Sequence, residues 1–103
     1  MPSQLIDTCE KFSKYVTSNY AYLTMLIENN LTEVLFTMMY KTMSTCRQSF
    51  VVLDEDTREY AALYTASGLC RITQKYIREH KKPDPKELTE LSYKIMSGSI
   101  YQS

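Results

Sequence analysis

Five residues between positions 60 and 78 have types and spacing that could bind a polyanion. They are Tyr60, Tyr64, Arg71, Lys75 and Arg78, separated by four, seven, four and three positions. On a helix these steps place all five on one stripe, roughly 60° wide at 3.6 residues per turn. Cations bind phosphates and exposed aromatic rings stack on bases, so the pattern is typical of proteins that bind single-stranded nucleic acid.

Two other interpretations of this stripe stay open. Cations near a helix C-terminus stabilise the helix by about 0.3–1 kcal/mol each without binding a ligand. An acidic protein could also bind there, because residues 71–86 hold six basic and two acidic side chains. Residues 54–59 hold four acidic side chains and one basic one. The segment therefore has opposite charges at its two ends, which would permit head-to-tail self-association.

A second candidate site lies around the methionine-rich segment VLFTMMYKTMSTC, residues 34–46. On a helical projection the apolar residues of this region cover roughly 200°, about twice the arc that one packing face needs. The excess predicts either a central helix with several neighbours or an apolar edge left for a partner. The edge would consist of Phe36, Met39, Met43 and Phe50. A two-fold homodimer is the commonest assembly that covers such an edge.

The sequence contains no arrangement of residues that is typical of catalysis. Two glycines are too few for a glycine-rich phosphate loop, and the single histidine, His80, lies in the basic stretch REHKK. The stretch DEDTREYAALYT begins like a calcium-binding loop, but Glu59 and Thr65 occupy the positions that need Gly and Glu. We therefore expect a protein that is not an enzyme, with no cofactor, no metal site and no small-molecule substrate.

Cysteine usage and overall charge indicate an intracellular protein. Cys9, Cys46 and Cys70 are an odd number without a C-x-x-C pair, so we expect them to be reduced and buried. Twelve basic and twelve acidic residues give no net charge that would attract nucleic acid or a membrane. The first 15 residues lack the features of a signal peptide, and no apolar run is long enough to span a bilayer. The expected location is the cytoplasm.

Four predicted helices position these residues. The first covers residues 3–28 and the second about 31–53. The third starts after DEDT, residues 54–57, which supply a cap, and continues to about residue 80, and the fourth begins at Pro85 after a cap at Asp84. The stretch FVVL at 50–53 could instead be a strand. Residues expected to face inward are Leu5, Cys9, Phe12, Val16, Tyr20, Leu23 and Ile27 in the first helix, Leu63, Ala66, Leu69, Cys70, Thr73, Tyr76 and Ile77 in the third, and Leu88, Leu91 and Ile95 in the fourth.

Amphipathic helices joined by short connections predict an all-α fold in one domain, residues 1–103, as a four-helix antiparallel bundle. A three-helix core with a peripheral fourth helix is the alternative. The predicted function is a small protein-interaction module, such as an adaptor, regulator or assembly subunit, that forms a homodimer through the edge defined above. Nucleic-acid association through the stripe of tyrosines and cations is the second hypothesis, and a purely structural self-assembling subunit is the third.

Overall fold

The computed structural model describes residues 2–44, 54–79 and 82–101. These residues form only helices: α1 (Pro2–Ser18), α2 (Tyr20–Glu28), α3 (Thr32–Ser44), α4 (Glu55–Glu79), α5 (Pro85–Met96) and the short 3₁₀ helix η2 (Ser99–Tyr101). The all-α prediction is therefore confirmed for this part of the chain. The possible strand at 50–53, Phe50 and Cys46 lie outside the described residues.

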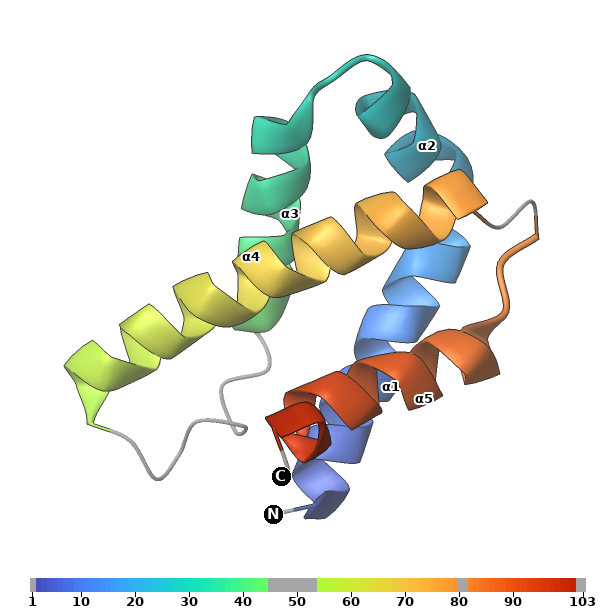
Figure 1. The fold of residues 1–103 in the computed structure, drawn as a ribbon. Coiled ribbons are helices and arrows are strands. Elements are labelled where there is room, and N and C mark those ends of the chain that lie inside the picture. The colour runs from blue at the N-terminus through green and yellow to red at the C-terminus, as the bar shows by residue number, and fades with distance from the viewer. Residues whose placement is uncertain (1, 45–53, 80–81, 102–103) are drawn as a thin grey trace.

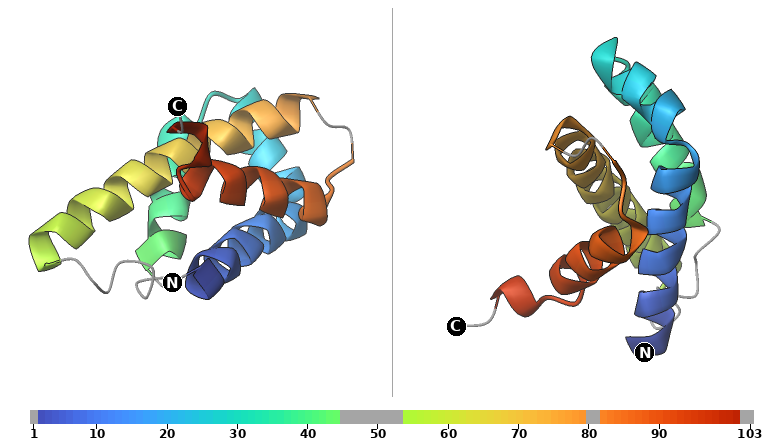
Figure 2. Two further views of the ribbon diagram at one scale, coloured as in Figure 1. Left: turned by 60° about the horizontal axis from the view of Figure 1, so that its bottom comes forward. Right: turned by 90° about the vertical axis from the view of Figure 1, so that its right-hand side faces the viewer.

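The helices do not lie side by side as an antiparallel bundle of four. Figure 1 shows α4, the longest helix, lying obliquely across α3, which it contacts. The second seam joins α1 to α5, and Figure 2 shows the two helices against each other from two further directions.

The predicted single helix over residues 3–28 is two helices, α1 and α2, which meet at Asn19. The amide of the Asn19 side chain donates to the carbonyl of Tyr15 over 2.9 Å, and the hydroxyl of Thr17 donates to the carbonyl of Ser13 over 3.0 Å. Polar side chains that bond to the local backbone in this way compete with regular helix geometry. The spacing of apolar residues did not predict this break, because it continues from Val16 to Tyr20 across Asn19.

The predicted caps of the two following helices are confirmed, whereas the predicted end of the second helix at about residue 53 lies outside the described residues. Asp54 caps α4, since its carboxylate accepts the backbone N–H of Thr57 over 2.8 Å. Asp84 caps α5 in the same way, with Pro85 at the first helical position. The turn after α2 uses Asn30 in the left-handed conformation, with φ of 58°, which Asn tolerates better than most residues.

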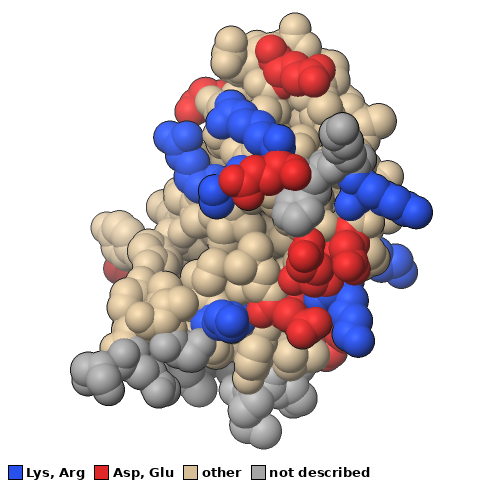
Figure 3. All heavy atoms as spheres, turned by 45° about the vertical axis from the view of Figure 1, so that its right-hand side comes forward, with Lys and Arg blue, Asp and Glu red and all other residues tan. Residues whose placement is uncertain are grey.

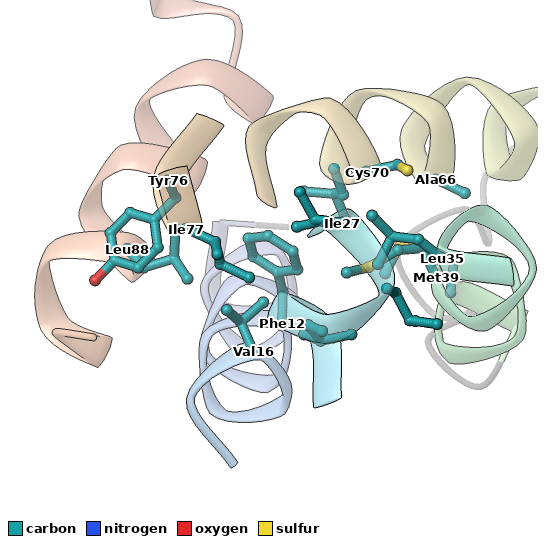
Figure 4. Close-up of a cluster of buried hydrophobic side chains, with 14 residues drawn as sticks. Phe12, Val16, Ile27, Leu35, Met39, Ala66, Cys70, Tyr76, Ile77 and Leu88 are labelled. Carbon is teal, nitrogen blue, oxygen red and sulfur yellow. The ribbon is translucent and has the colours of Figure 1, made fainter. Parts of the chain in front are cut away.

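One continuous core joins the two seams (Figure 4). Phe12 and Val16 of α1 lie between a group formed by Tyr76, Ile77 and Leu88 and a group formed by Ile27, Leu35, Met39, Ala66 and Cys70. Most residues expected to face inward are buried, but Leu63 and Leu91 are exposed. Leu5, Tyr20 and Ile95 are half-buried.

Candidate interaction surfaces

The methionines of α3 belong to the core, not to an exposed edge. Met39 is 1% exposed and Met43 is 2% exposed, so of the two interpretations of the apolar arc the central helix holds in the protomer, and these two side chains form no exposed edge. Both methionines belong to the same core cluster as Ala66 of α4. A small side chain on a neighbouring helix leaves room for long, flexible methionines. Phe36 is half-buried and stacks on Tyr40, with ring centroids 6.2 Å apart.

The stripe predicted on the third helix does lie on one exposed face, the outer face of α4. Tyr60 is 74% exposed and Tyr64 is 73% exposed. Arg71, Lys75 and Arg78 continue along the same side and are also exposed. The structure therefore brings together all five residues that were selected from the sequence, whereas binding of a polyanion by them stays a prediction.

Neighbouring side chains already engage part of this positive charge. The ammonium of Lys75 lies 2.7 Å from a carboxylate oxygen of Glu79, and both side chains are mostly exposed. The guanidinium of Arg71 donates to the side-chain oxygen of Gln74 over 3.3 Å. Exposed pairs of this kind contribute about 0–1 kcal/mol, so both cations can be drawn to another partner at low cost.

A third exposed tyrosine adjoins this face. Tyr101 in η2 is 73% exposed, and hydrogen bonding to Tyr64 raises the pKa of its hydroxyl. The contact joins the C-terminal end of the described chain to α4. Sequence reasoning missed it because 37 positions separate the two tyrosines, and no periodicity within one helix can report such a pair.

The seam between α1 and α5 is lined by hydroxyl groups. Ser13, which is 1% exposed, donates to the carbonyl of Pro85 over 2.7 Å and accepts from the hydroxyl of Thr89 over 2.8 Å. One turn away, the thiol of Cys9 approaches the sulfur of Met96 at 3.9 Å. Burial raises the pKa of the Cys9 thiol, while a hydrogen bond with Ser92 opposes the shift. Cys9 and Cys70 are free and buried, as predicted.

A groove of about 450 Å³ opens on the outer side of this seam. Helix α1 contributes Glu10, Ser13, Lys14 and Thr17 to its lining. Helix α5 contributes Pro85, Lys86, Thr89 and Glu90. Figure 3 shows acidic and basic side chains close to one another over the face turned toward the viewer. None of these groove residues was selected from the sequence, because only the packing of α5 on α1 brings them together.

The described residues offer no other obvious chemical centre. No group of three or more His, Cys, Asp or Glu residues among them could hold a metal ion. No helix in these same residues is long and apolar enough to cross a membrane.

Comparison with known families gives one match. The family model of the TetR type, described as a transcriptional regulator C-terminal region, matches residues 3–98. No curated protein and no solved structure matches the chain.

Proposed function

Because this chain belongs to the TetR-type family of transcriptional regulator C-terminal regions, we propose that it controls a regulator by forming a homodimer through the outer face of α4. The family is regulatory and non-enzymatic, and its C-terminal domains typically homodimerise. Nucleic acid is bound in such regulators by an N-terminal domain, not by the region matched here. A dimer interface on α4 takes the place of the dimer interface predicted at Met39 and Met43, because those two side chains are already buried in the core.

The observation that carries the proposal is the exposure of large aromatic side chains along one helix face. Tyr60 and Tyr64 are each about three-quarters exposed, Leu63 is exposed at the edge of this face, and Tyr101 bonds to Tyr64. Tyrosine is enriched in protein interfaces, and contiguous exposed apolar surface of this kind marks interaction sites. The first turns of α4 also extend beyond the neighbouring helices in Figure 1, so a partner can reach them.

The position of Gly68 also favours the outer face of α4 as the dimer interface. Gly68 lies in the middle of α4 and is exposed, and a Cβ added there would meet no heavy atom within 4 Å beyond its own helix backbone and chain neighbours. Glycine inside a helix costs about 1 kcal/mol relative to alanine, and no neighbouring element among the described residues requires it. A second helix that crosses closely at Ser67 and Gly68 would explain why a small residue stands there.

A two-fold axis near Ser67 and Gly68 would pair the two halves of the stripe. In an antiparallel pair of α4 helices, Tyr64 of one protomer would face Arg71 of its partner, and Tyr60 would face Lys75. Cations over tyrosine rings attract by about 0.5–1 kcal/mol at exposed sites. The acidic first turn of each α4 would lie near the basic last turn of the other. The residues first selected for nucleic acid thus also fit a second copy of the chain.

The test is the native mass by light scattering at low micromolar concentration. We expect a dimer, and we expect Gly68→Leu and Arg71→Glu each to give monomers with unchanged helix content. Tyr22→Glu is the matched control, because Tyr22 is an exposed tyrosine on α2, and this variant should stay dimeric. A monomeric native protein, or a dimer that survives both α4 substitutions, would overturn the proposal.

A second candidate function is the binding of single-stranded nucleic acid by the same stripe. The exposure of all five of its residues favours it. Neutralising phosphates releases counterions, so affinity for a labelled oligonucleotide should fall steeply as salt is raised. The two candidates compete for one face, so added oligonucleotide should also shift the dimer toward monomer; a flat salt response would remove this candidate.

A further inference from the structure

The groove between α1 and α5 has a register that brings like charges to face one another. Ser13 forms hydrogen bonds with both Pro85 and Thr89. Along the seam it therefore lies opposite position 87 of α5, midway between those two residues. Because the two helices run in opposite directions, Lys14 is then level with Lys86. Three residues to the other side, Glu10 is level with Glu90. The groove therefore has a basic end and an acidic end.

None of the four charged side chains forms an ion pair within the described part of the chain. Among those residues the only ion pair is that of Lys75 with Glu79 on α4, outside the groove lining. Along each helix the opposite charges are one turn apart, Glu10 before Lys14 and Lys86 before Glu90, a spacing that contributes only about 0.2–0.5 kcal/mol per pair. Across the groove the arrangement leaves two sites for charged groups of a ligand, a carboxylate pair and an ammonium pair.

Hydroxyl groups line the groove, with Thr89 between the two ends and Thr17 beyond the basic end. The Thr17 hydroxyl donates to the carbonyl of Ser13, and the Thr89 hydroxyl donates to the carbonyl of Pro85. Both oxygens keep lone pairs that can accept hydrogen bonds. The acidic and basic ends are four residues apart along each helix, which at a rise of 1.5 Å per residue is about 6 Å.

From this geometry we propose that the groove binds a small zwitterion, with its cationic group between Glu10 and Glu90 and its anionic group between Lys14 and Lys86. The anionic group is a carboxylate or a phosphate. The two charges must be separated by a short chain of about one helical turn. This site goes beyond the dimer proposed above and does not depend on it, because it lies on α1 and α5.

The first experiment is calorimetric titration of the whole protein with two zwitterions, 5-aminopentanoate and 3-aminopropyl phosphate. Saturable binding of at least one is expected, and the tighter of the two identifies the anionic group. Pentanoate and pentylamine carry one charge each and should bind at least about tenfold more weakly, a difference of about 1.4 kcal/mol. Equal binding of pentanoate or pentylamine, or no saturable binding of either zwitterion up to 10 mM, would overturn the proposal.

Substitutions then separate the two ends of the groove. Glu10→Gln with Glu90→Gln should abolish the preference of the protein for 5-aminopentanoate over pentanoate. Lys14→Gln with Lys86→Gln should abolish the preference over pentylamine. The control is Lys11→Gln, which changes an exposed charge of α1 outside the groove and should bind as the native protein does. Circular dichroism checks that each variant folds, and an equal loss of binding in the control would count against the site.

Discussion

The two helix seams of this protein are built from different kinds of side chain. Between α3 and α4, the apolar side chains of Leu35 and Met39 lie in one core cluster with Ala66 and Cys70 (Figure 4). Between α1 and α5, hydroxyl groups of Ser13, Thr89 and Ser92 take much of the space. An apolar seam gains free energy from the area it buries, whatever its alignment. Hydrogen bonds are satisfied in only one alignment, so the hydroxyl seam fixes the register of α5.

This difference between the two seams also predicts that they open at different free energies. Only Leu88 and Ser92 of α5 are buried, whereas α4 buries eight residues. Regions with few buried apolar contacts open at lower free energy than the rest of a protein. We therefore expect α5 to detach from α1 before α3 and α4 separate. In a regulatory domain this makes the α1–α5 seam the part that a ligand in the groove could most easily tighten.

The largest effect should follow from damage to the apolar seam. Met39→Ala removes most of a side chain that is 1% exposed, and such cavities cost about 2–5 kcal/mol. Urea denaturation measures the loss. Met25→Ala, at an exposed methionine of α2, is the control and should change stability by less than about 0.5 kcal/mol. Equal losses in the two variants would mean that α3 does not form the centre of the core.

A smaller effect is expected in the hydroxyl seam. Ser13→Ala removes two hydrogen bonds, but the Thr89 hydroxyl can still donate to the Pro85 carbonyl. The net cost should be about 1 kcal/mol. Hydrogen exchange should show the change in the amides of α5 and not in those of α3. If exchange accelerates evenly through the protein, the two seams open as one unit and the comparison fails.

Cysteine labelling provides the finest measure of the difference, because each seam holds one buried thiol. Burial raises the pKa of both Cys9 and Cys70, so near neutral pH neither is a reactive thiolate in the closed state. Labelling then reports opening of each seam. In variants that keep one cysteine, Cys9 should react about tenfold faster than Cys70, which corresponds to about 1.4 kcal/mol. Equal rates would show that α5 does not open separately.

Sequence reasoning located the helix ends where one side chain decides them. Asp54 and Asp84 are recognisable because a carboxylate before a helix has one obvious set of donors. The break at Asn19 was missed, since the hydrophobic period continues through it. Met39 was ambiguous for a different reason. A wide apolar arc indicates that a helix buries a large surface, but it does not show which neighbour buries Met39. In the structure Met39 shares the core with Ala66 of α4, a contact that the sequence of α3 alone cannot reveal.

The candidate surfaces show the same limit. The outer face of α4 could be predicted, because Tyr60 to Arg78 lie on one helix and periodicity alone places them together. The groove could not, because Glu10 and Glu90 are ordinary exposed charges when each helix is considered alone. They line one groove only because the hydrogen bonds of Ser13 align α5 with α1 in this way. Tyr101 was missed likewise, since its contact with Tyr64 links two distant segments.

The pairing of α1 with α5 has a consequence for synthesis on the ribosome. Ser13 and Thr89 are 76 positions apart, and translation at about 5–20 residues per second puts roughly 4–15 s between them. During that interval the nascent chain cannot complete the first seam, whereas α3 and α4 can already meet. A surface of serine, threonine and cysteine is less adhesive toward other chains than one of leucine. The composition of this seam thus suits a helix that must wait for its partner to be made.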